Sequence, residues 1–237
     1  LAKADQAAEI RSSVPDIELF LMLDGVIDGY EAYEDAVAAH DATALENRVA
    51  GTDMLYSSGT TGRPKGVLPE FVPTSLDEYG SGVENLLNLL FGMNDQKVYL
   101  SPAPLYHAAP LRFCMAVLAC GSTVVVMEKF DPERYLQLVA EHGVTHSQLV
   151  PTMFVRMLKL PDEVRTAYDV SSLEVAIHAA APCPVAVKQQ MIDWWGPVIH
   201  EYYAGTEGNG FVYCNSEMWL GHLGTVGMPI NCAVHIV

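Results

Sequence analysis

The sequence contains little positive charge. Of its 237 residues only 13 are Lys or Arg, whereas 29 are Asp or Glu, and the formal net charge is −16. No run of Lys and Arg offsets this charge. Such a chain repels nucleic acids and anionic membrane surfaces, so we expect neither as a partner. If the protein binds an anionic small molecule, its few cations have to be concentrated at that site.

Cysteine is scarce and follows no pattern. The five cysteines form no C-x-x-C pair, which argues against a disulfide framework or a zinc site and favours reduced thiols in the cytoplasm. The most apolar stretch, 113–127, is shorter than a membrane span and is interrupted by Gly121 and Ser122. Residues 1–11 show no signal-peptide pattern. The chain begins at Leu1 rather than Met and stops at Val237 in strand-like sequence, so we expect a fragment.

Three common catalytic or phosphate-binding patterns are missing. No G-x-S-x-G is present, which argues against a nucleophilic serine of the α/β-hydrolase type. A Walker A loop counted from Gly59 would need glycine where Pro64 stands, and the same segment contains no G-x-G-x-x-G.

Instead, residues 56–67 read YSSGTTGRPKGV, a loop rich in small and hydroxyl side chains that follows a short apolar strand at 53–56. Glycines let the backbone approach a ligand closely, and free N–H groups and hydroxyls can donate to phosphate oxygens. Arg63 and Lys65 add positive charge to an otherwise acidic chain. The loop therefore predicts a nucleotide-phosphate site.

The order of elements predicts an α/β fold, with mostly parallel sheets flanked by helices. The β-branched run at 123–127 is typical of a central parallel strand. Asp131 and Pro132 predict the start of a helix that ends at Gly143, and a further strand follows at 145–150, which makes a β-α-β unit. Other predicted elements are helices at 85–91, 152–160 and 184–194, and strands at 97–100, 174–177 and 198–203. After Gly210 we expect antiparallel strands, which divides the chain into a partial α/β core at 1–209 and the start of a β subdomain at 210–237.

Ligands of open α/β sheets bind beyond the carboxyl ends of the strands. Three further segments follow predicted strands: PAPLYH at 102–107, AAAP at 179–182 and YYAGTEG at 202–208. The last contains an aromatic ring that can stack on a purine, a hydroxyl that can reach a phosphate, and a carboxylate that can hold Mg²⁺.

Together these four segments resemble the adenylate-forming (ANL) superfamily, which includes acyl-CoA synthetases, luciferases and peptide-synthetase adenylation domains. Residues 57–66 resemble its Ser/Thr-Ser-Gly-Thr-Thr-Gly-x-Pro-Lys-Gly loop, and 203–207 its Tyr-Gly-x-Thr-Glu motif with Ala204 in place of glycine. Residues 179–182 resemble its Gly-Ala-Ala-Pro segment, and 104–107 its Pro-Leu-Phe/Tyr-His motif.

The resemblance implies roles for individual residues. Lys65, His107, Thr206 and Glu207 would act in catalysis, with Glu207 as the Mg²⁺ ligand and Tyr203 stacked on adenine. Tyr106, His107 and Ala179 would border the acid substrate. The nucleotide-binding set would be Ser57, Ser58, Gly59, Thr60, Thr61, Gly62, Lys65, Gly66, Ala180, Ala181, Tyr203, Ala204, Gly205 and Thr206.

The implied reaction uses ATP, Mg²⁺ and coenzyme A. A carboxylic acid would be activated as an acyl-adenylate and transferred to the CoA thiol, and Met115, Val117 and Leu118 suggest an apolar acid such as a fatty acid. The ribose-binding Asp and the C-terminal lid domain of the superfamily are expected beyond Val237, so the fragment alone should be nearly inactive. An amino-acid adenylation domain, a luciferase-like oxidase and a non-catalytic nucleotide-binding remnant are the alternatives.

Overall fold

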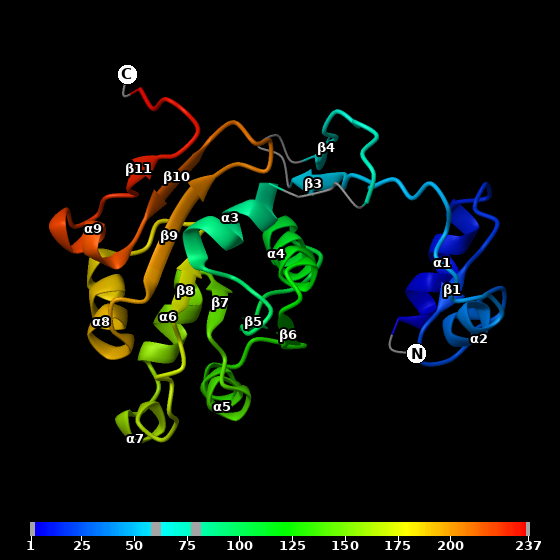
Figure 1. The fold of residues 1–237 in the computed structure, drawn as a ribbon. Coiled ribbons are helices and arrows are strands. Elements are labelled where there is room, and N and C mark those ends of the chain that lie inside the picture. The colour runs from blue at the N-terminus through cyan, green and yellow to red at the C-terminus, as the bar shows by residue number, and fades with distance from the viewer. Residues whose placement is uncertain (1–2, 58–62, 77–81, 236–237) are drawn as a thin grey trace. The chain divides into compact units, whose positions relative to one another are not determined.

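The computed structural model describes residues 3–57, 63–76 and 82–235 (Figure 1). The chain divides into two compact units, residues 1–48 and 49–237. The first unit contains helices α1 (Ala4–Ser13) and α2 (Tyr33–Ala38) and the short parallel strands β1 (Leu21–Met22) and β2 (Glu31–Ala32). Phe20 and Tyr30 pack with ring centroids 5.2 Å apart, and the Tyr30 hydroxyl donates to the Ala7 carbonyl at 2.8 Å. Within this unit no residue of either helix is buried.

The second unit contains a seven-stranded sheet with the order β11-β10-β9-β8-β7-β5-β6. A separate antiparallel hairpin consists of β3 (Leu55–Ser57) and β4 (Lys65–Val67). The strands of the large sheet are β5 (Val98–Ser101), β6 (Thr123–Val126), β7 (His146–Leu149), β8 (Val175–His178), β9 (Ile199–Ala204), β10 (Phe211–Cys214) and β11 (Met228–Pro229). The helices are α3 (Gly82–Phe91), α4 (Ala108–Ala119), α5 (Pro132–His142), α6 (Pro151–Leu158), α7 (Asp162–Arg165), α8 (Val185–Trp195) and α9 (Ser216–Gly221).

Strands β6, β5, β7, β8 and β9 are mutually parallel, and β10 and β11 continue the sheet in antiparallel pairing. This confirms the predicted α/β class with a mostly parallel sheet and antiparallel strands near the C-terminus. The division expected at residue 210 stays a prediction. Within the described residues, β9 before it and β10 after it pair in a single sheet.

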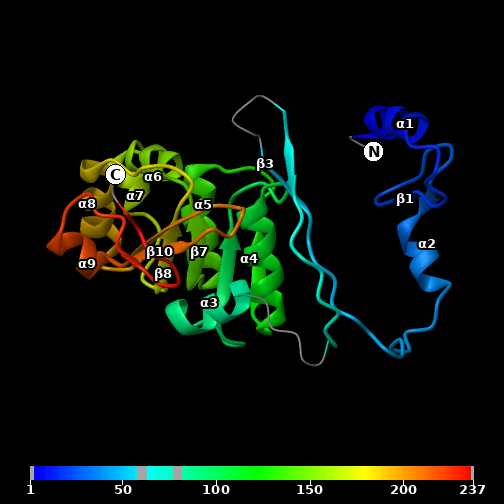
Figure 2. The same cartoon turned by 90° about the horizontal axis from the view of Figure 1, so that it is seen from above.

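Helices cover both faces of the sheet (Figure 2). Strand alternation sends Ala176 into a core with α5, α6 and α8, whereas Val175 and Ile177 enter a second core with α3 and α4. Trp195 belongs to the first core, where it stacks on Tyr135 at 6.0 Å, so the Trp194-Trp195 pair serves helix packing. The two cores fix the strands from both sides, and they leave the strand ends free to carry loops.

The start of α5 follows the prediction. The Asp131 carboxylate accepts a hydrogen bond from the backbone N–H of Arg134 at 2.9 Å, Pro132 is the first helical residue, and Gly143 ends the helix in the left-handed conformation at φ 58°.

The prediction of a central strand at 123–127 is wrong. In the described residues β6 pairs with β5 alone and forms the edge of the sheet, and Val126 is 51% exposed. A β-branched run fits any pleated strand that is partly covered, because β-propensity reflects side-chain packing and not the number of neighbouring strands.

Candidate functional site

The carboxyl ends of the parallel strands carry three of the four predicted site segments. Residues 102–107 follow β5, residues 179–182 follow β8, and the 202–208 segment begins in β9 and continues into the turn after it. Because these strands run parallel, their carboxyl ends lie at the same edge of the sheet. Three strand intervals separate β9 from β5, which is about 14 Å at the usual spacing.

The sheet also has a topological switch point at this edge. The chain leaves β5 through α4 to reach β6 on one side, and it later returns to β7 on the other side of β5. Helix α4 packs on one face of the sheet, and α5 and α6 pack on the opposite face. Connections that diverge in this way leave a crevice at the carboxyl ends of the two strands, which is where open α/β sheets bind ligands.

The predicted phosphate loop lies on the β3–β4 hairpin. Ser57 pairs with Lys65 and Tyr56 pairs with Gly66, so the two ends of the loop are held beside each other. Arg63 and Lys65 are both exposed. The other predicted residues of this loop lie outside the described residues: Ser58, Gly59, Thr60, Thr61 and Gly62.

Helix α4 contacts segments that carry or precede three of these four motifs. Its first turn follows His107, which occupies the N-cap position. Arg112 forms an ion pair with Asp53, just before β3, with Nε and Oδ2 2.7 Å apart. The next residue, Phe113, stacks on Tyr202 of β9 with ring centroids 6.1 Å apart. One helix therefore connects the phosphate hairpin, the 102–107 segment and the strand that carries Tyr203.

In the turn after β9, Glu207 is exposed and Thr206 is half-buried. The Gly208 N–H donates to the Gly205 carbonyl at 3.1 Å, which places Thr206 and Glu207 at the centre of a tight turn. Gly208 has φ 72°, a conformation that glycine adopts without strain. Tyr203, just before the turn, is 68% exposed. Its neighbour Ala204, where the superfamily usually has glycine, is also exposed.

The two tyrosines of this motif have different tasks. The Tyr202 ring packs inward and its hydroxyl accepts a hydrogen bond from the Gln148 amide at 2.6 Å. Burial raises the pKa of Tyr202 to about 12, so the hydroxyl stays protonated. Tyr202 fixes the strand end, and Tyr203, on the opposite face of the strand, is available to a ligand.

The segment after β8 contains a strained residue. Ala179 is buried, whereas Ala180 and Ala181 are exposed. Ala180 adopts φ 73°, a left-handed conformation that disfavours residues with a Cβ atom. Strain of this kind is concentrated at functional sites, where the surrounding structure maintains it.

The 102–107 segment ends in two exposed rings. Tyr106 is 81% exposed and its ring centroid lies 4.4 Å from that of His107. The His107 side chain is also exposed. His107 is therefore not a buried structural histidine.

The suggestion of an apolar pocket lined by Met115, Val117 and Leu118 is wrong as a single surface. Met115 and Leu118 lie on the exposed side of α4, whereas Val117 is fully buried in the core beneath it. Residues 115 and 118 are one helical turn apart and share a side, while residue 117 points elsewhere.

A buried charge cluster beneath this edge was not predicted from the sequence. The Lys188 ammonium lies 2.7 Å from Oε2 of Glu201, and Nε2 of His178 lies 3.5 Å from the same oxygen. Lys188 and His178 are fully buried. Burial, reinforced by the Lys188 charge, lowers the pKa of His178 to about 3, so the imidazole is neutral at physiological pH. The sequence contains a sign of the burial of Lys188, because this residue lies on the same side of α8 as Met191, Ile192 and Trp195, which are apolar and buried.

The site offers one carboxylate, that of Glu207, as a possible ligand for Mg²⁺. Among the residues that the structure describes, no three His, Cys, Asp or Glu side chains are grouped as a metal site. The single exposed carboxylate of Glu207 fits Mg²⁺, which is often held by one or two carboxylates together with substrate phosphates.

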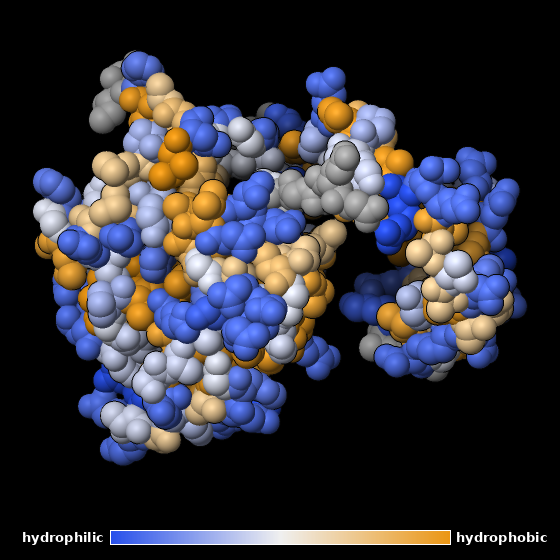
Figure 3. Space-filling model, viewed as in Figure 1, coloured by the Kyte–Doolittle hydropathy of each residue, from blue (hydrophilic) through white to orange (hydrophobic). Residues whose placement is uncertain are grey.

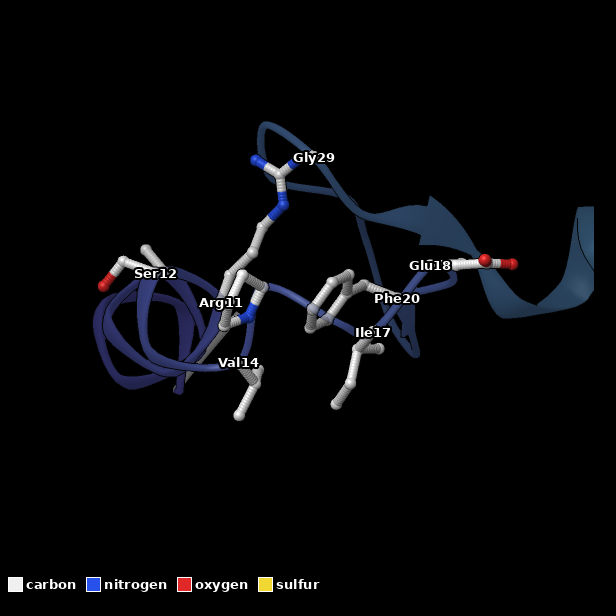
Figure 4. A pocket seen from close by; sticks show the side chains of 9 residues that line it. Arg11, Ser12, Val14, Ile17, Glu18, Phe20 and Gly29 are labelled. Carbon is white, nitrogen blue, oxygen red and sulfur yellow. The ribbon is translucent and has the colours of Figure 1, made fainter.

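A separate pocket occurs in the first unit (Figure 4). Its lining includes Arg11, Phe20 and Gly29, and the Arg11 guanidinium lies 5.8 Å from the centroid of the Phe20 ring. None of the predicted site residues lines this pocket. In the described ranges no helix has both the length and the apolar character needed to cross a membrane.

Comparison with known proteins identifies the family. A sequence profile of the AMP-binding enzyme family matches residues 2–237. A 2-succinylbenzoate–CoA ligase of Bacillus velezensis is 28% identical over the whole chain and 48% of its own length. A 4-coumarate–CoA ligase of Oryza sativa subsp. japonica is 37% identical over 68% of the chain and 29% of its own length.

Solved structures share the fold. The amide bond synthetase McbA from Marinactinospora thermotolerans aligns with a TM-score of 0.76 and 25% identity, over 97% of this chain and 45% of that chain. The chain thus spans about half or less of the length of these relatives. With a profile match over almost every residue and the same fold, the chain belongs to the AMP-binding enzyme family of the adenylate-forming superfamily.

Proposed function

We propose that the protein is an AMP-forming acid–thiol ligase, which uses ATP to activate a hydrophobic carboxylic acid and transfers the acyl group to coenzyme A. The observation that carries the proposal is the convergence of residues 102–107, 179–182 and 205–208 at one edge of the sheet. The contacts of α4 with Asp53, before the β3–β4 hairpin, and with Tyr202 of β9 support a single shared site.

The residues divide between the two ends of the nucleotide. Ser57, Lys65 and Gly66, with the loop between them, would bind the β- and γ-phosphates. Tyr203 would stack on the purine against the small Ala180–Ala181 wall, and Thr206 would donate to the α-phosphate. Small side chains on one side and a flat exposed ring on the other fit a planar base.

The acid would bind beside Tyr106 and His107, at the switch point between β5 and β7. An exposed imidazole at the start of α4 can donate to the carboxylate. Glu207 would hold Mg²⁺, which supplies charge neutralisation at the phosphates when it is bound.

The chemistry needs positioning and charge neutralisation only. In the first step a carboxylate oxygen attacks the α-phosphorus, and the bond to the departing pyrophosphate breaks. In the second step the CoA thiolate attacks the acyl carbon and AMP leaves, while the thiol proton passes to solvent. Lys65, placed at the leaving phosphates, would stabilise the charge that develops there. No side-chain nucleophile is required.

The acid is proposed as hydrophobic, with aryl acids favoured over fatty acids. The two CoA ligases above are named for 2-succinylbenzoate and 4-coumarate, both aryl acids. Their names support coenzyme A as acceptor, whereas the name of McbA makes an amine the alternative acceptor.

The test is ATP–pyrophosphate exchange by the full-length gene product across aryl, fatty, steroid and amino acids, followed by thiol and amine acceptors. Exchange with an aryl or fatty acid and transfer to CoA would support the proposal. Exchange only with amino acids would favour an adenylation domain, and ATP binding without exchange would favour a non-catalytic remnant.

Substitution at the site separates these outcomes further. We expect Lys65→Ala or Glu207→Gln to slow exchange by about 10²-fold to 10³-fold, because each removes a charge that acts on the phosphates. Lys159→Ala, at the C-terminal end of α6, and Glu163→Gln, in the first turn of α7, remove the same kinds of exposed charge and should leave the rate unchanged.

A further inference from the structure

A lysine and a glutamate lie buried against each other between α8 and β9. Lys188 is fully buried and Glu201 is 8% exposed, with Nζ and Oε2 2.7 Å apart. The Lys188 ammonium also lies 5.3 Å from the centroid of the Trp219 ring. On the other side of the carboxylate, His178 makes no hydrogen bond among the described residues.

Stability alone is a poor explanation for this pair. Removing two charges from water is costly, and buried ion pairs can often be replaced by apolar side chains of similar volume without loss of stability. An ion pair instead constrains geometry, because one short contact fixes the position of the two backbone segments relative to each other.

The pair lies where such geometry matters for the site. Glu201 is two residues before Tyr203 on β9, so both side chains leave the strand on the same face. Lys188 is the fourth residue of α8, the helix that follows the 179–182 segment. His178, beside the pair, directly precedes Ala179. The contact therefore joins the strand that carries the proposed purine-stacking ring to the helix that follows the opposite wall.

The opposite edge of the same sheet offers a comparison. Lys97 and Glu174 form an ion pair at 2.6 Å just before β5 and β8, at the amino ends of the strands. Its side chains are partly exposed, and the proposed site segments lie at the other ends of the strands. This pair has the same chemistry at a place that is remote from the site.

We infer that Lys188 and Glu201 are positioning residues, which hold Tyr203 and the 179–182 segment at the separation that a purine ring requires. The inference rests on the proposed ATP site and extends it to two residues that do not touch the nucleotide. Losing the pair should impair ATP recognition even where the fold is retained.

The test compares two double variants of the full-length gene product. Lys188→Met with Glu201→Leu should unfold at a urea concentration similar to that of the parent, while its KM for ATP in pyrophosphate exchange rises about tenfold to a hundredfold, as expected for a misplacement of about 1 Å. Lys97→Met with Glu174→Leu should leave the KM for ATP unchanged. Lys188→Arg keeps the ion pair and should retain most of the ATP affinity.

The outcomes distinguish the inference from the proposed function. A folded Lys188→Met/Glu201→Leu variant with the parental KM for ATP would overturn the positioning role. If that variant fails to fold, Lys188→Met with Glu201→Gln, which keeps the side-chain shape at 201 and leaves no buried charge unpaired, should show the same rise in KM, and an unchanged KM would overturn the inference. Absence of ATP-dependent exchange in the unsubstituted protein would instead contradict the proposed function.

Discussion

The strained alanine after β8 offers a quantitative test of the described backbone. Ala180 adopts φ 73°, where a Cβ atom costs about 1–2 kcal/mol. Ala180→Gly removes this cost, but it also increases the conformational entropy of the unfolded chain, which lowers the free energy of unfolding by about 0.4–1 kcal/mol. The difference predicts that Ala180→Gly raises the free energy of unfolding by about 0.5–1 kcal/mol, or the Tm by a few degrees.

Its neighbour provides a matched control of opposite sign. Ala179 is 5% exposed and has no left-handed backbone, so Ala179→Gly loses a buried methyl and gains unfolded-state entropy. We expect Ala179→Gly to lower the free energy of unfolding by about 1–2 kcal/mol. Urea denaturation followed by tryptophan fluorescence measures both variants. Equal destabilisation by the two substitutions would refute the left-handed conformation at Ala180.

Three further predictions follow from packing, protonation and charge. Gly227 has φ 100°, and a Cβ atom there would overlap a backbone carbonyl of β10. Gly227→Ala should therefore lower the free energy of unfolding by more than about 2 kcal/mol in thermal melts. The control Gly221→Ala, in α9 with open space around it, should leave stability unchanged or raise it. Burial, and then the charges of other cationic groups, lowers the pKa of His200 to about 4, below its unfolded value of about 6.5. The contribution of His200 to the free energy of unfolding is therefore complete above pH 6.5 and falls by about 1.4 kcal/mol per pH unit towards pH 4. His200→Gln should flatten the urea midpoint between pH 6.5 and pH 4, and an unchanged slope would contradict the lowered pKa. Asp53→Asn breaks the ion pair with Arg112 that connects the phosphate hairpin to α4. This substitution should lower the free energy of unfolding by less than about 1 kcal/mol, because both groups are partly exposed, yet it should raise the KM for ATP several-fold. An unaltered KM would show that the contact does not position the hairpin.

Much of the fold could be predicted because its elements carry local signals. The Asp131-Pro132 start and the Gly143 end of α5 are recognisable from residue type alone, and the structure has both. The place of β6 was not predictable in this way. A run of valines specifies a pleated strand, but the strand order depends on contacts between residues far apart in the sequence.

The candidate site shows the same division. The loop segments could be recognised from residue type and order, and the parallel strands explain why three of them meet at one edge. The burial of Lys188 could be inferred from the apolar stripe that it shares on α8, but its partner Glu201 could not, because a glutamate is ordinarily a surface residue and the pairing forms only when α8 packs on β9. Likewise, the left-handed backbone of Ala180 leaves no trace in its residue type.

We propose that one nucleotide spans the β3–β4 hairpin and the turn after β9. A crystal structure of the full-length gene product with a non-hydrolysable ATP analogue and Mg²⁺ would show whether it does. We expect the purine ring between Tyr203 and the Ala180–Ala181 wall, with the terminal phosphates at Lys65. A nucleotide bound elsewhere, or hairpin and turn too far apart for a single ATP to reach both, would contradict it.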